Sequence, residues 1–121
     1  MATYTDITTG VQSDTATGAI TGTLDTSSLS GDYTVEAVFT LTAGTAIVAV
    51  EDTANATAFS DAVQVAVFHI KGATPSEGVT FSKKSYEIPG TRFGATNTKL
   101  RFNVLAITGS GTLTTHGMLI Q

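Results

Sequence analysis

The sequence predicts an all-β fold, a single antiparallel β-sandwich or jelly-roll-like domain. Apolar and polar residues alternate with a period of two in many short segments, and no segment carries the sustained stripe of an amphipathic helix. Both prolines, Pro75 and Pro89, fall between those segments, where a residue that cannot donate a backbone hydrogen bond is tolerated. A length of 121 residues fits one domain.

About seven strands are expected, each a run of alternating or β-branched apolar residues bounded by turn residues. In residues 33–41, for example, Val35 and Phe39 fall on one face and Glu36 on the other. The Thr-Gly-Ser-Gly segment at 108–111 predicts a hairpin between the last two strands, because glycine adopts positive φ at little cost. The expected strands are residues 16–24, 32–41, 45–52, 62–70, 78–88, 98–107 and 112–120.

The first dozen residues differ from the rest of the chain. They are polar, with three isolated apolar residues, Tyr4, Ile7 and Val11. Such a segment could form a first edge strand, or an arm that reaches a neighbouring subunit. We assign residues 1–12 to an extended N-terminal arm and residues 13–121 to the sandwich, and we take Tyr4, Ile7 and Val11 as candidate subunit contacts.

Composition and charge exclude several classes of function. The chain contains no cysteine, so it has no disulfide, thiol nucleophile or thiolate metal site. It shows no signal peptide and no membrane-length apolar run, so we expect synthesis in a cytoplasm and no membrane partner. Residues 1–70 carry eight acids and no Lys or Arg, whereas residues 71–121 carry all six basic residues. The basic half is mild, so nucleic acid is not an expected partner, but two surfaces of opposite sign would form if the fold keeps the halves apart.

No catalytic or metal constellation is visible in the sequence. The only histidines are His69, at the end of a row of valines, and His116. Nothing places them together with a carboxylate, and no serine lies in a G-x-S-x-G motif. We therefore expect both histidines to occupy strand positions without a chemical role. The protein is predicted not to be an enzyme, with no cofactor and no metal.

Three expected strands are apolar on both faces. In the last of them, Leu100 and Ala106 fall on one face, while Leu105 and Ile107 fall on the other. A small antiparallel sandwich covers only one face of each strand, so apolar residues on both faces predict an interface. We expect a homo-oligomer, either a dimer or a trimer, or binding to a larger assembly. The three segments are residues 46–50, 62–70 and 100–107.

In composition and strand layout the whole chain resembles the small capsid decoration, or cement, proteins of tailed bacteriophages. It is rich in Thr, Ala and Gly, lacks cysteine, and ends in a strand with the sequence Gly-Met-Leu-Ile-Gln at 117–121. The resemblance carries over no functional residue. It implies a structural protein of the virion, assembled in the host cytoplasm, that binds the major capsid protein or another virion protein and stabilises the assembled capsid lattice.

Two other classes of function remain open. A carbohydrate- or receptor-binding β-sandwich would need surface aromatic residues on one face, and the chain has three tyrosines and no tryptophan. A small barrel enzyme of the cupin kind would need a histidine-rich metal set, which two histidines can hardly supply.

Overall fold

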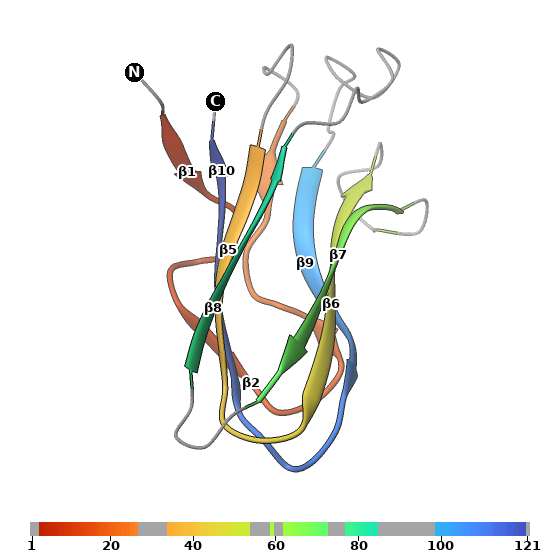
Figure 1. The fold of residues 1–121 in the computed structure, drawn as a ribbon. Helices are drawn as coiled ribbons and strands as arrows, with labels where there is room; N and C mark the ends of the chain where they lie inside the picture. The colour runs from red at the N-terminus through yellow and green to blue at the C-terminus, as the bar shows by residue number, and fades with distance from the viewer. Residues whose placement is uncertain are drawn as a thin grey trace.

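In a computed structural model, two antiparallel sheets pack face to face and form a β-sandwich (Figure 1). The structure describes residues 3–26, 34–53, 59, 62–72, 77–84 and 99–120, and only the backbone of residues 77–84. The predicted all-β sandwich is confirmed, and no described residue lies in an α-helix. None of the described segments is therefore a helix long and apolar enough to cross a membrane. The strands are β1 (Tyr4–Asp6), β2 (Gln12–Asp14), β3 (Gly18–Ala19), β4 (Leu24–Asp25), β5 (Thr34–Leu41), β6 (Thr45–Thr53), β7 (Val63–Lys71), β8 (Glu77–Lys84), β9 (Lys99–Ile107) and β10 (Leu113–Ile120).

The strand order is that of a jelly roll. Sheet A has the order β1-β10-β5-β8, and β2 also pairs with β10. Sheet B has the order β3-β9-β6-β7, and β4 also pairs with β9. The pairs are nested: β6 with β7, then β5 with β8, then β3 and β4 with β9, and outermost β1 and β2 with β10. The chain is thus one long hairpin folded over itself, which is the jelly-roll arrangement.

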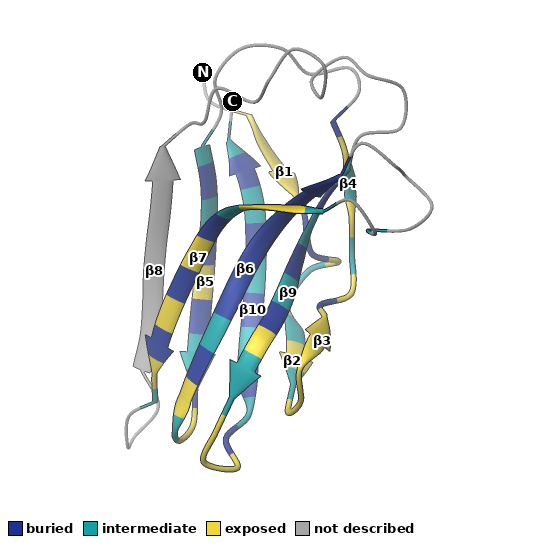
Figure 2. Cartoon of the chain, turned by 90° about the vertical axis from the view of Figure 1, so that its right-hand side faces the viewer, coloured by how far each residue is buried: buried dark blue, intermediate teal, exposed yellow. Residues whose placement is uncertain are grey.

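The core lies between the sheets and is built from alternate residues of the long strands. Figure 2 shows the resulting stripes of buried and exposed residues along β7. Three phenylalanines from both sheets meet at the centre, with ring centroids 5.5 Å apart for Phe39 and Phe68 and 6.4 Å apart for Phe68 and Phe102. Gly117 of β10 makes room for this cluster, because a Cβ at that position would lie 2.3 Å from the Phe102 ring.

The N-terminal segment forms the edge of sheet A, whereas the sequence predicted an extended arm. Tyr4 pairs with Ile120 and Gln12 pairs with Thr115. Between these pairs, the Ile7 N–H donates to the carbonyl oxygen of Gly117 at 2.8 Å. Hydrogen bonds to β10 and burial of an apolar side chain both favour the folded-back position, so the segment lies along its own sheet.

A β-bulge in β9 reverses part of the predicted face assignment. Ile47 pairs with Ala106, but Val48 pairs with Val104, so that Leu105 is the extra residue. Beyond the bulge the alternation shifts by one residue. Ala106 therefore shares the outer face with Ile47, and Ile107 packs against the core. The prediction that Ala106 shares a face with Leu100, and Ile107 a face with Leu105, is therefore wrong.

The predicted strand at residues 16–24 is shorter than expected. It forms two brief pairings with β9, at β3 and β4, separated by Ile20, whose side chain is buried in the core. The predicted strand at residues 78–88 corresponds to β8, and its last four residues lie outside the described residues. Pro75, Pro89 and Tyr33 also lie outside them.

Candidate interaction surface

The outer face of sheet B carries a contiguous apolar surface. The registers of β6 with its two neighbours define rows of side chains across three strands. Because directly paired residues point to the same side of a sheet, each row lies on one face. We call this surface the sheet B face; its members are Ile47, Ala49, Val67, His69, Leu105 and Ala106.

Part of the sheet B face is open to solvent. Val67 is 42% exposed and Leu105 is 37% exposed, the latter because the bulge turns it outward. Ala49, which pairs with Val67 and Asn103, is fully buried although it belongs to the outer face. The prediction that residues 46–50, 62–70 and 100–107 are apolar on both faces is thereby confirmed at these positions.

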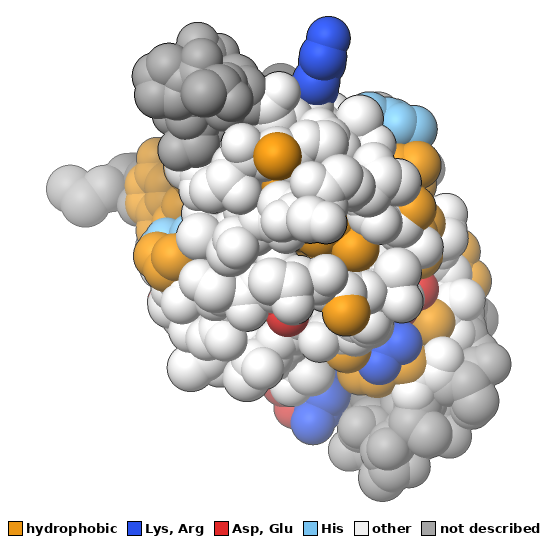
Figure 3. All heavy atoms as spheres, turned by 90° about the horizontal axis from the view of Figure 1, so that it is seen from below, with side chains coloured by type: hydrophobic (Ala, Val, Ile, Leu, Met, Phe, Trp, Pro, Cys, Tyr) orange, Lys and Arg blue, Asp and Glu red, His pale blue; other side chains and the backbone are white. Residues whose placement is uncertain are grey.

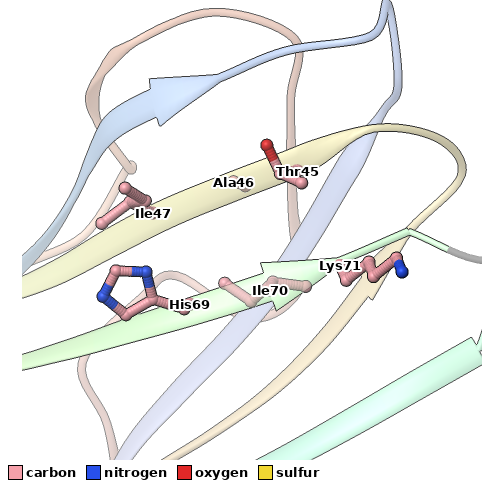
Figure 4. A pocket seen from close by; sticks show the side chains of 6 residues that line it. All are labelled: Thr45, Ala46, Ile47, His69, Ile70 and Lys71. Carbon is pink, nitrogen blue, oxygen red and sulfur yellow. The ribbon is translucent and has the colours of Figure 1, made fainter.

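A shallow depression lies at one end of the sheet B face, between β6 and β7 (Figure 4). Its volume is about 320 Å³. Figure 4 shows Ile47 and His69 side by side on the two strands, with Lys71 at the far end of β7. The lining offers one imidazole and one ammonium group beside aliphatic carbon, which suits contact with protein. The lining residues are Thr45, Ala46, Ile47, His69, Ile70 and Lys71.

A polar cluster bounds the other end of the sheet B face. Arg101 Nε donates to Glu51 Oε1 at 2.8 Å, and Asn103 Nδ2 donates to Glu51 Oε2 at 3.2 Å. The guanidinium of Arg101 also lies 4.0 Å from the centroid of the Phe59 ring, a cation–π contact. Glu51 is 8% exposed, so the pair is largely shielded from solvent. This arrangement gives the apolar surface a polar border.

The same ion pair corrects the expectation of two surfaces of opposite charge. Nested pairing places strands of the acidic half beside strands of the basic half, as with Glu51 and Arg101, or Asp25 and Lys99. Charges of opposite sign are therefore interleaved across the described part of sheet B.

The two histidines lie on opposite outer faces of the sandwich. His69 faces outward from sheet B, and His116 from sheet A, where its Nε2 lies 2.9 Å from Asp6 Oδ1. The core separates them, so they cannot share a ligand. Among the residues that the structure describes, no three His, Asp or Glu side chains are grouped to hold a metal ion. That neither histidine has a functional role stays a prediction.

The three candidate subunit contacts do not form one surface. Ile7 is 1% exposed and packs in the core of its own chain, so its predicted contact with a neighbouring subunit is wrong. Tyr4 is 60% exposed and Val11 is 67% exposed. Their role as subunit contacts remains a prediction.

The lower end of the sandwich is a second possible surface, but its construction points to a structural role. Figure 3 shows that it is mostly uncharged. Its turns are held together by hydrogen bonds such as that between the hydroxyls of Thr45 and Thr108, at 2.8 Å. Gly44 has φ +78° there, and a Cβ would lie 1.9 Å from the carbonyl oxygen of Thr108. The close approach of the two turns therefore explains both the glycine at position 44 and the hydrogen bond between the threonines. No ligand is needed to account for them.

Sequence reasoning found the apolar strands but missed the polar border. Glu51, Arg101 and Asn103 are far apart in the chain, and only the register of β6 with β9 brings them together. No model of a known protein family matches the chain, and none of the curated proteins is similar to it in sequence.

Proposed function

We propose that the protein is a non-enzymatic structural component of a tailed-bacteriophage virion, a decoration or cement protein that docks on the assembled capsid lattice. The observation that carries the proposal is the sheet B face. An antiparallel sandwich needs only its inner faces to form a core, so a contiguous apolar outer surface is suited to contact with another protein.

The chemistry of the sheet B face favours a protein partner. Its exposed side chains are aliphatic at Val67 and Leu105, with one imidazole at His69, whereas sugar rings are usually bound against Tyr or Trp side chains. The borders carry Lys71 at one end and the Glu51–Arg101 pair at the other. An apolar centre with a polar rim is the usual composition of a protein interface, and charges at the rim set orientation more than affinity.

The jelly-roll fold agrees with this function without deciding it. The same architecture serves viral capsid proteins, lectins and cupins, so the proposal depends on the surface and on the resemblance in composition. The partner that we propose is the major capsid protein or another virion protein, bound by a dimer or trimer of this chain in the virion.

Binding to capsids tests the proposal. Capsids assembled from the major capsid protein of the same genome are sedimented with the wild-type chain, with Leu105→Asp and with Val38→Asp. The two residues are matched, since each is 37% exposed on an outer face, the first on sheet B and the second on sheet A. We expect Leu105→Asp to bind at least about tenfold more weakly, because a charge then enters the apolar contact, and Val38→Asp to bind as wild type does.

Two results would contradict the proposal. Equal capsid binding by both variants would show that the sheet B face is not the contact. Absence of any binding to the capsids, together with saturable binding to a glycan array, would favour the carbohydrate-binding alternative.

A further inference from the structure

Each sheet has one edge formed by a long strand, β8 in sheet A and β7 in sheet B, and only the β8 edge is protected against pairing with another strand. Sheet B ends at β7 and sheet A ends at β8, and no other described strand pairs with the outer side of either. An open edge presents unpaired backbone N–H and C=O groups, and proteins commonly block such edges with charged residues. The segment of β8 contains Glu77, Lys83 and Lys84.

The β7 edge has no such protection. Its nine residues carry one formal charge, Lys71, at the very end, and they contain no proline. Val63 and Val67 are exposed at 48% and 42%. A long, uncharged edge strand with exposed valines is a template for β-pairing, so a monomer that left it open would be prone to uncontrolled association.

From this contrast we propose that the β7 edge pairs antiparallel with the β7 edge of a second copy of this chain, about a twofold axis. The purpose of this pairing rests on the proposed function. The pairing adds to that function the contact through which the chain associates with itself. It joins the two B sheets into one continuous sheet and places two sheet B faces side by side.

The regular part of β7 sets the register. The pairing of β6 with β7 shifts between Val50 and Glu51, so Val65 is the extra residue of a bulge, and the residues from Ala66 onward are regular. Pairing of the segment 66–70 with its copy centres on Phe68. Val67 of each copy then lies opposite His69 of the other on the outer face.

The pairing brings no like charges together. Segment 66–70 holds no Lys, Arg, Asp or Glu, so no like charges meet across the axis. Isologous contacts of this kind close after two copies and use up the open edge. The charges of the β8 segment work against the same extension of sheet A at its long edge strand, which favours a dimer over a larger assembly.

Sedimentation of the isolated protein, with no capsid present, tests the pairing. We expect the wild-type chain to form a dimer, and Val67→Lys to raise the dimer dissociation constant at least about tenfold, because an edge lysine opposes pairing. The matched control is Val38→Lys, since Val38 is similarly exposed but lies on β5, which has neighbours on both sides. That control should stay dimeric, and both variants should keep the β spectrum of wild type.

A cross-linking experiment tests the register, and the absence of cysteine from the chain makes it unambiguous. An oxidised mixture of the Val67→Cys and His69→Cys proteins should give a disulfide-linked heterodimer in much higher yield than either protein alone, because directly opposite Cβ atoms are close enough for a disulfide. A mixture of Val38→Cys and His69→Cys serves as the control.

The pairing is overturned if the wild-type chain is monomeric at high concentration, if Val38→Lys disrupts the dimer as much as Val67→Lys does, or if the two cysteine mixtures cross-link equally. The proposed function fails separately. Capsid binding by Leu105→Asp is measured with capsids present, whereas dimer formation is measured in their absence. A dimer that does not bind capsids would contradict only the proposed function. A monomer that binds them would contradict only the pairing.

Discussion

The outer faces of the two sheets differ in how their apolar residues are arranged, although both sheets share one core. On sheet A, Met118 lies between Asp6 and Glu36 in one row across the strands, so an acid flanks it on each side. On sheet B, Ile47 lies between His69 and Ala106 in the corresponding kind of row. Because these residues point away from the core, burial in the core does not explain the arrangement on either outer face.

The difference separates an ordinary protein surface from a surface that is suited to association. Dispersed apolar residues on a polar face are normal on any protein surface and need no explanation. A contiguous apolar group on an outer face gains nothing for the fold of a single copy, and it favours association. Of the two outer faces, the sheet B face is therefore the better suited to contact with a partner.

The largest expected effect comes from breaking the core that both faces share. Gly117→Ala places a methyl group against the Phe102 ring and should lower the free energy of unfolding by about 1–3 kcal/mol. Chemical denaturation of the purified protein measures the loss. The double variant with Phe102→Leu should recover part of it, because the smaller side chain can move away. An unchanged unfolding midpoint in Gly117→Ala would mean that the two sheets are not packed as described.

The next largest effect is the stability cost of removing the acidic partner from a charged pair, and it is compared between the two outer faces. Glu51→Gln should cost about 1–2 kcal/mol of stability at neutral pH, since it leaves the partly covered Arg101 without its counter-charge. Asp6→Asn removes the partner of His116 on sheet A, where the Asp6 side chain is 52% exposed, and should cost no more than about 0.5 kcal/mol. Denaturation curves of the two variants provide the comparison, and equal costs would show that the border of the sheet B face is no better shielded than sheet A.

The smallest effect concerns Asp14, at the pairing of β2 with β10 in sheet A. Burial raises the pKa of this carboxyl group, and its Oδ2 has no hydrogen-bond partner within the described part of the chain. Because the pKa is higher in the folded state, the folded protein holds this proton more tightly. The resulting stabilisation is complete below the unfolded pKa and is lost as the pH rises through the folded pKa.

The substitution Asp14→Asn removes this penalty of ionisation. It should therefore stabilise the protein at neutral pH, on the order of 0.5 kcal/mol because the residue is only partly buried, and the gain should vanish in acid. Unfolding midpoints measured as a function of pH provide the check. A gain that persists unchanged at low pH would point to a cause other than the carboxylate charge.

The sequence by itself determined the fold class, the main strands and the presence of strands that carry apolar residues on both faces. Period-two alternation is a local property, so Val35, Ala37 and Phe39 could be assigned to one buried face without knowledge of their partners. The apolar excess of residues 46–50 was visible for the same reason.

Only the tertiary structure decided the positions that depend on pairing. The bulge at Leu105 exchanges the faces of Ala106 and Ile107, and alternation cannot reveal an extra residue that is defined by the partner strand. Ile7 is in the core because the N-terminal segment finds hydrogen bonds along β10, more than a hundred residues away in the chain. The Glu51–Arg101 border and the open edge of β7 likewise arise from the order of the strands, which local sequence patterns do not contain.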